Sequence, residues 1–371
     1  MPETDGARDG APRSQRSRSG GQRARGGASG GSGASGREAP LYGALDLGTN
    51  NCRLLIARPA RDGFRVVDSF SRIVRLGEGL SRTGRLDDAA MERAYEALAL
   101  CGERVARKGV ESARLMAVAT QACRQADNGA AFIERVREGT GLRLRIIDPM
   151  EEARLSVEGC LNLFDDRAEA VLVVDVGGGS TELSWLKRTD GGFASAGWMS
   201  APIGVVTLAE RHPEPASRDA GALDEWYEAM VRGMGEALAA APADPALREM
   251  FAAGRAHLVG TSGAITSLAG IHLGLRRYQR NLVDGLWMTR DDCERAADRL
   301  MEMGPAGRAA ESCIGPDRAD LVLAGAAIME AVQRAWPSQR VRVADRGLRE
   351  GLLLTAMREG RRTGGRRRRR R

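Results

Sequence analysis

The stretch VLVVDVGGGSTEL, Val171–Leu183, is the part of the sequence that decides the fold. It begins with an apolar run that ends at glycines, which indicates a buried strand entering a tight turn. Gly177–Gly179 allow the backbone to approach a ligand closely and to turn its N–H groups toward an anion. The flanking acids, Asp175 and Glu182, would repel a bare phosphate, so they favour a divalent cation or an attacking water beside it. The simpler alternative is a glycine-rich hairpin with solvated acids.

A second copy of this pattern, ALDLGTNNCRL, occupies Ala44–Leu54. Each copy has a strand, an acid, a glycine two residues later, a small polar loop and a second strand. The positions that align are Asp46 with Asp175, Gly48 with Gly177, Asn51 with Ser180 and Leu54 with Leu183. Because the acid and the glycine recur together, the repeat favours two related lobes that face each other across a cleft.

Composition suits a globular protein of two domains with basic ends. The chain has 371 residues, of which 43% are apolar and 28% charged. Residues 1–38 carry a net charge of +3 and residues 358–371 one of +8, so the total of +7 leaves −4 for the middle. We therefore expect no sequence-specific nucleic-acid surface. Residues 1–38 and 359–371 are predicted to be disordered, because they offer little apolar surface to bury.

Cysteine and histidine spacing argues against a metal site built from these residues. The six cysteines form no C-x-x-C pair and the three histidines no H-E-x-x-H motif. Residues 1–38 contain no apolar core of a secretory leader, so a reduced, cytoplasmic protein is expected. Residues 256–275 are uncharged and about long enough to cross a bilayer. They contain two histidines and four glycines, so we predict no membrane span.

The apolar periodicity predicts an order of elements that is similar in the two halves. We expect strands at 41–47, 52–58, 64–76, 114–119, 142–147, 170–174, 181–187, 193–200, 257–260 and 340–344. We expect helices at 87–108, 128–137, from 149, 205–211, 223–240, from 264, 290–303, 319–335 and 348–358, and a turn at 120–124. The predicted lobes are residues 39–160 and 161–358.

Phosphoryl transfer to water needs donors around the phosphate, a cation and a carboxylate that activates the water. The residues that could bind phosphate are Gly48, Thr49, Asn50, Asn51, Arg53, Arg124, Gly177, Gly178, Gly179, Ser180, Thr181 and Gly263. Asp175 and Glu182 could hold Mg²⁺ through water, and Glu152 or Glu151 could act as the base. Taken alone, each of these residues is compatible with an ordinary surface position as well as with a role in the site.

Six motifs occur in the order found in the exopolyphosphatase and guanosine pentaphosphate phosphohydrolase family, which this chain resembles over about residues 41–357. They are ALDLGTNNCRLLI, TQACR, EEARL, DVGGGSTEL, GTSGAITSLA and ADRGLREGLLL. The resemblance implies an α/β fold of two duplicated ribonuclease-H-like lobes, as in actin and hexokinase, with a cleft between them. It also implies hydrolysis of a terminal phosphoanhydride with Mg²⁺.

By the same resemblance, Glu152 matches the family's general base, and Asp175 and Glu182 match acids near the metal and the water. Asp148–Met150 departs from the Ser-Gly that often precedes the two glutamates. The sequence ends before the helical domain of longer members, so a short form is expected.

The substrate stays open between inorganic polyphosphate and guanosine pentaphosphate (pppGpp). An actin-type nucleotide-binding regulator is the alternative from another class. The oligomeric state is undecided, with a homodimer among the options.

Overall fold

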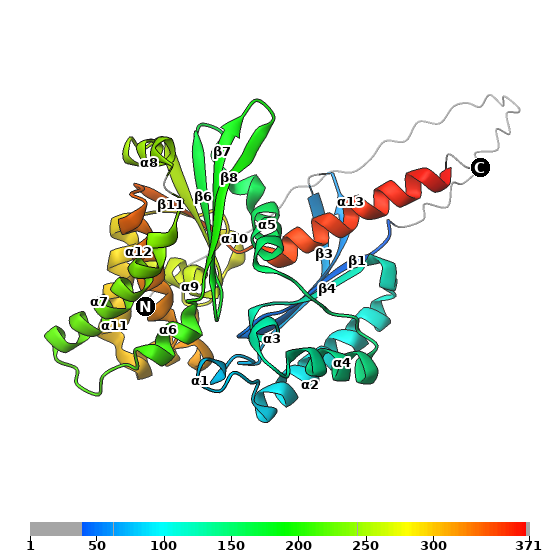
Figure 1. Ribbon diagram of the computed structural model, residues 1–371, viewed down its shortest axis with the longest axis horizontal. Helices are drawn as coiled ribbons and strands as arrows, with labels where there is room; N and C mark the ends of the chain where they lie inside the picture. The colour runs from blue at the N-terminus through cyan, green and yellow to red at the C-terminus, as the bar shows by residue number, and fades with distance from the viewer. Residues whose placement is uncertain (1–38, 62, 243, 369–371) are drawn as a thin grey trace, which may run out of the picture. The chain divides into compact units, whose positions relative to one another are not determined.

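Two sheets with the same topology organise the chain (Figure 1). Their strand orders are β3-β2-β1-β4-β5 and β10-β11-β9-β6-β7-β8. In each sheet three antiparallel strands continue into parallel strands, so β8-β7-β6-β9-β11 repeats β3-β2-β1-β4-β5. The computed structural model describes residues 39–61, 63–242 and 244–368. The predicted disorder of residues 1–38 falls outside them.

The strands are β1 Tyr42–Leu47, β2 Asn51–Ala60, β3 Gly63–Ile73, β4 Leu115–Ala119, β5 Arg145–Ile146, β6 Ala170–Val176, β7 Thr181–Thr189, β8 Gly192–Ala201, β9 Ala256–Thr261, β10 Trp287–Thr289 and β11 Arg340–Ala344. The α-helices are α1 Leu80–Thr83, α2 Asp88–Lys108, α3 Gln121–Gln125, α4 Gly129–Thr140, α5 Pro149–Cys160, α6 Val205–Arg211, α7 Ala220–Ala237, α8 Pro245–Ala252, α9 Gly263–His272, α10 Arg280–Val283, α11 Arg290–Ala310, α12 Val322–Ala335 and α13 Leu348–Arg368. Four short 3₁₀ turns complete this order, among them η4 at Pro316–Arg318.

The predicted repeat is confirmed in the two hairpins that open the sheets. β1 pairs antiparallel with β2 and β6 with β7. In the first turn Gly48 N donates to Asn51 O at 2.8 Å, and in the second Gly177 N donates to Ser180 O at 2.9 Å. The residues that aligned in sequence therefore make the same hydrogen bond in both lobes.

Each lobe has an apolar core on one face of its sheet. In the first lobe, side chains of β1 and β2 pack against α2 and α4. In the second lobe, β6, β7 and β9 pack against α7, α9, α11 and α12. The other face of the first sheet is covered by α13, whereas α5 packs on β6, β7 and β8 of the second sheet and also contacts α13. Both lobes belong to one unit that starts at Ala39.

The last helix corrects the predicted lobe boundary. The division at 161–358 assigned it to the second lobe, whereas Leu352, Leu353 and Ala356 pack on the first sheet. α13 also runs to Arg368, ten residues past the predicted end at 358. The segment 359–371, predicted to be disordered, is therefore helical as far as Arg368, and residues 369–371 lie outside the described part.

Two local predictions in the first lobe were also wrong. The predicted turn at 120–124 is instead the short helix α3, in which Gln121, Ala122 and Cys123 are buried. The predicted strand at 142–147 pairs with β4 only through Arg145 and Ile146. Helices α1, α8 and α10 and strand β10 were not predicted, since each is short.

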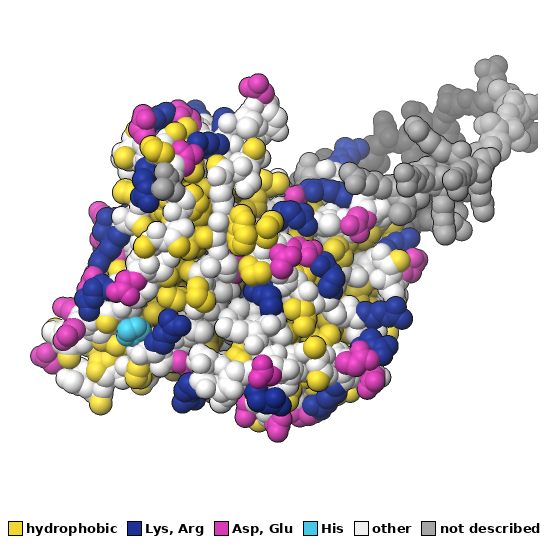
Figure 2. Space-filling model, in the orientation of Figure 1, with side chains coloured by type: hydrophobic (Ala, Val, Ile, Leu, Met, Phe, Trp, Pro, Cys, Tyr) yellow, Lys and Arg dark blue, Asp and Glu magenta, His cyan; other side chains and the backbone are white. Residues whose placement is uncertain are grey.

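The surface shown in Figure 2 carries acidic and basic side chains interspersed, without a continuous basic field on that face. Over the described residues, no helix combines the length and the apolarity that a bilayer crossing requires.

Candidate active site

A cleft of about 410 Å³ lies where the two glycine turns meet, a size typical of small-molecule sites. Its walls come from both lobes and include the first turn from Gly48 to Asn51, the second turn from Gly177 to Ser180, and the start of α9 from Thr261 to Ala264. The topology explains this convergence: β1, β6 and β9 all end at the cleft. The structure thus brings together the three loops that the sequence singled out.

The first turn presents oxygen atoms that have no partner. Asp46 Oδ1, Asn50 Oδ1 and Asn51 Oδ1 are buried and accept no hydrogen bond from the described residues. Thr49 Oγ1 instead donates to Gln121 Oε1 at 3.1 Å. Buried polar oxygens without partners are costly and usually mark a place for water, an ion or a ligand.

The second turn approaches the first so closely that glycine is required. A Cβ at Gly178 would lie 2.9 Å from Thr49 Cβ and 3.2 Å from Asn50 N. A Cβ at Gly179 would lie 2.0 Å from Gln121 Oε1. The two lobes therefore contact each other through their glycine turns. The backbones of both turns line the same cleft.

Four carboxylates gather around the cleft, and burial raises the pKa of each. The pKa of Asp46 rises to about 6, mainly by desolvation, although Arg53 opposes the shift. Desolvation and then Asp175 raise the pKa of Glu182 to about 7. Desolvation raises the pKa of Glu152, with Glu182 adding to it, and also that of Asp175. Such a cluster holds excess negative charge that a cation would stabilise.

Glu152 stands at the start of α5, as Pro149 predicted. Asp148 caps this helix by accepting from Glu151 N at 2.8 Å. Glu152 is 9% exposed and lines the cleft, whereas Glu151 pairs with Arg145 at the surface. Of the two adjacent glutamates, the structure therefore turns Glu152 toward the two glycine turns.

Arg124, predicted to bind phosphate, contacts this acid instead. Its Nη1 lies 3.2 Å from Glu152 Oε2 and donates to Ile147 O at 2.6 Å. It does not line the cleft. Its positive charge lowers the pKa of Glu152 against the effect of burial.

Glu182 and Thr181 also lie behind the cleft wall. Glu182 Oε1 accepts from Ser180 Oγ at 2.7 Å and from Ser200 Oγ at 3.0 Å. Thr181 Oγ1 donates to Ile203 O at 2.7 Å. Neither side chain lines the cleft, so both are poorly placed to touch a ligand directly.

One part of the cleft wall is basic. Arg53 and Arg318 line it, and neither makes an ion pair within the described residues. Burial, and then the charge of Arg53, lower the pKa of Arg318. A Cβ at Gly263 would lie 3.5 Å from Arg318 Nη1 and 3.9 Å from Arg53 Nη2. Two arginines and the N-terminus of α9 thus converge on one space, an arrangement that suits an anion.

Ser262, at the entry to α9, holds a strained backbone with φ of 145°. Its Oγ accepts from Ala264 N at 3.2 Å and from Ile265 N at 3.4 Å, so it caps the helix. Strain of this kind concentrates at ligand sites.

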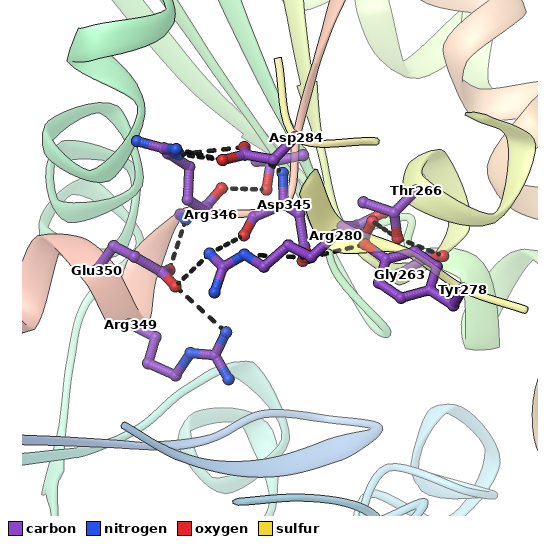
Figure 3. A network of polar contacts seen from close by, with 12 residues as sticks. Gly263, Thr266, Tyr278, Arg280, Asp284, Asp345, Arg346, Arg349 and Glu350 are labelled. Carbon is purple, nitrogen blue, oxygen red and sulfur yellow. Dashed lines mark hydrogen bonds and ion pairs between the residues drawn. The ribbon is translucent and has the colours of Figure 1, made fainter. Parts of the chain in front are cut away.

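A polar network forms the back of the cleft (Figure 3). Tyr278 donates to Asp345 Oδ2 at 2.7 Å, and Arg346 forms an ion pair with Asp284. Glu350, 3% exposed, accepts from Gly347 N at 3.0 Å and from Arg280 Nη2 at 3.3 Å. These charges are satisfied within the protein and fix the loop between β11 and α13.

Sequence reasoning missed several of these residues. Asp46 was aligned with Asp175 but not taken as a site residue, although that equivalence was the available signal. Arg318 had no signal, because it is one residue of a chain with 56 Lys and Arg. Gln121 and Asp345 became visible as cleft residues in three dimensions alone.

The donors in the cleft fit a magnesium ion that is partly coordinated by substrate and water. Among the described residues, no three His, Cys, Asp or Glu side chains form a cluster that could hold a metal by themselves. Mg²⁺ is commonly bound through one or two carboxylates, waters and substrate phosphates. Asp46, with an unpartnered oxygen, and Asp175 meet that requirement.

A model of the Ppx/GppA phosphatase family matches residues 55–359. The chain belongs to the Ppx/GppA phosphatase family. The resemblance inferred from the six motifs is confirmed, and so is the α/β fold of two duplicated lobes.

Solved structures agree over most of the chain. The Ppx/GppA family member from Aquifex aeolicus is 27% identical with a TM-score of 0.69, and the match covers 86% of this chain and 98% of that one. A protein described as exopolyphosphatase-like is 30% identical with a TM-score of 0.74 and the same coverage. An exopolyphosphatase from Cytophaga hutchinsonii, 23% identical, has a TM-score of 0.73 over the same shares and supports the fold alone.

Proposed function

We propose that this phosphatase-family protein is a Mg²⁺-dependent exopolyphosphatase that releases the terminal phosphate of inorganic polyphosphate. The observation that carries the proposal is one cleft lined by Glu152, by the carboxylates Asp46 and Asp175, and by the two arginines Arg53 and Arg318. A hydrolase for a phosphoanhydride chain needs a base at one end of the reacting phosphate and cations around the rest.

In this mechanism Glu152 accepts the proton of the attacking water on its carboxylate. A raised pKa brings a carboxylate nearer to the working pH and makes it a better base, and the charge of Arg124 opposes the rise. The backbone N–H groups of both glycine turns would bind the terminal phosphate, and Gly178 and Gly179 permit the required approach. Water would attack in line, opposite the leaving phosphate chain.

Asp175 and Asp46 would hold Mg²⁺, directly or through water. Bound there, the ion would neutralise phosphate oxygens and stabilise charge that develops on the leaving group. Glu182 was predicted as a metal ligand and a catalytic residue. Because two serines hold its carboxylate, it would influence the ion through its charge beside Asp175 and would not bind the ion directly. Arg53, Arg318 and the start of α9 would bind the next phosphates.

One observation favours pppGpp as the second candidate. Ile314, Leu321 and Val322 give part of the cleft an apolar wall, and Tyr278 lines the cleft as well. A nucleoside could bind against these side chains, whereas a bare phosphate chain would gain nothing from them.

The deciding experiment is a competition between the two substrates on the purified chain with Mg²⁺. The proposal predicts phosphate release from long polyphosphate, abolished by EDTA, and weak inhibition by pppGpp. If kcat/KM is higher for pppGpp than for polyphosphate, pppGpp is the preferred substrate and the exopolyphosphatase proposal is wrong. ATP binding without phosphate release from either compound would contradict hydrolysis and favour a nucleotide-binding regulator.

A further inference from the structure

The segment that follows β3, from Val74 to Ser81, is bound to the first glycine turn through its backbone. Val74 N and Arg75 N both donate to Asn50 O, at 2.9 and 3.1 Å. Gly77 N donates to Thr49 O at 2.9 Å. A Cβ at Gly77 would lie 2.2 Å from Thr49 Cγ2, so the two stretches are in direct contact. Any movement of this segment must move Thr49 and Asn50.

The same segment contacts the second lobe through side chains and through the backbone N–H of Gly79. Arg75 binds Asp320 through two hydrogen bonds of 3.0 and 3.1 Å, and its Nη2 donates to Asp317 O at 3.0 Å. From the other lobe, Glu210 accepts from Gly79 N at 2.9 Å and from Ser81 Oγ at 2.8 Å. Both contacts join residues more than a hundred positions apart, and both cross from one lobe to the other.

The partner helix is in turn bound to the second glycine turn. Glu210 lies on α6, where Val205 N donates to Gly177 O at 3.0 Å and Val206 N donates to Gly178 O at 2.7 Å. A continuous set of hydrogen bonds therefore runs from Asn50 in the first turn, through the segment and Glu210, to the second turn.

Two features show that this connection is not ordinary packing. Arg75 has a φ of 47°, one of two non-glycine residues with positive φ among those described, and such strain is typical of functional positions. A pocket of about 330 Å³ is lined by Asn50, Arg75, Glu210 and Asp320. The lobes thus meet here through exposed polar contacts beside a pocket rather than through apolar packing, and such contacts can open at little cost.

We propose that Arg75 and Glu210 are positioning residues that hold the two lobes in a closed arrangement, with both glycine turns against the substrate. We call the contacts of Arg75 with Asp320 and of Glu210 with Gly79 and Ser81 the clasp. The inference rests on the proposed function for its activity readout only. Single surface ion pairs are weak. Replacing the Arg75 contact with a like-charge pair is expected to change the ratio of closed to open molecules about tenfold.

The test is a charge exchange across the clasp. Arg75→Asp and Asp320→Arg each put like charges opposite each other, and aspartate tolerates the positive φ at position 75. Each single variant is expected to lower kcat/KM for polyphosphate about tenfold, and the double variant R75D/D320R to recover most of it. Glu210→Gln, which keeps size but loses an acceptor, is expected to lower kcat/KM by about threefold. Arg334→Asp is the matched control, since Arg334 pairs with Glu228 and Glu330 inside the second lobe.

A readout without catalysis separates this idea from the proposed function. In small-angle scattering with pyrophosphate, R75D is expected to show a larger radius of gyration than the parent and the R75D/D320R double variant. If the parent hydrolyses nothing but this difference appears, the exopolyphosphatase proposal fails and the clasp stands. The clasp is wrong if R75D matches the parent in radius of gyration and stays within twofold of it in kcat/KM. It is also wrong if the double variant recovers neither the radius of gyration nor the kcat/KM of the parent.

Discussion

Arg53 and Glu182 occupy equivalent positions in the two glycine hairpins. Arg53 lies opposite Asp46 in the β1–β2 pair, and Glu182 lies opposite Asp175 in the β6–β7 pair. The repeated hairpin thus carries a cation in one lobe and an acid in the other. Because Arg53 lines the cleft and Glu182 is held behind it, the duplicated scaffold gives an asymmetric site.

Asp46 is expected to destabilise the ligand-free protein at neutral pH. Its folded pKa of about 6 lies above the ordinary aspartate pKa of 3.8, so its contribution to stability is present below about pH 4 and is lost as the pH rises through 6. The stabilising effect of Asp46→Asn should therefore be about 2 kcal/mol larger at pH 8 than at pH 4.5. Urea unfolding in EDTA at both pH values measures this. An equal effect of the substitution at the two pH values would contradict the raised pKa.

Gly178 is expected to be irreplaceable because it touches the opposite lobe. Gly178→Ala places a methyl group 2.9 Å from Thr49 Cβ, and the resulting displacement should lower kcat/KM by about tenfold or more. Gly235→Ala, in an open position on α7, is the control. It should raise the free energy of unfolding by about 0.5–1 kcal/mol and leave kcat/KM unchanged. Equal kinetics of the two variants would show that the lobes do not need this approach.

Arg124 is expected to set the acid limb of the pH–rate profile. Its charge lowers the pKa of Glu152, so Arg124→Gln should raise that pKa further and leave the base protonated up to a higher pH. The acid limb of kcat/KM should then move to higher pH. Arg145→Gln, which removes the partner of the neighbouring Glu151, should leave the limb in place. A limb that moves to lower pH, or moves equally in both variants, would refute this role.

The sequence predicted those features that local patterns encode. The repeat of acid and glycine predicted the two lobes, and Pro149 before Glu151 and Glu152 predicted the start of α5. It could not predict that Leu352 and Leu353 return to the first sheet, because an apolar helix face does not specify its partner. Nor could it tell that Arg124 faces Glu152 while Arg318 enters the cleft. Arginines are alike in sequence and are distinguished by tertiary contacts.

The most direct test of the account compares the two adjacent glutamates of α5. Phosphate release from long polyphosphate with Mg²⁺ is measured for Glu152→Gln and Glu151→Gln, with pyrophosphate binding as a check that the cleft is intact. The account predicts that Glu152→Gln lowers kcat about a hundredfold or more while binding persists, and that Glu151→Gln stays near the parent. Undiminished turnover in Glu152→Gln, or an equal loss in both variants, would contradict it.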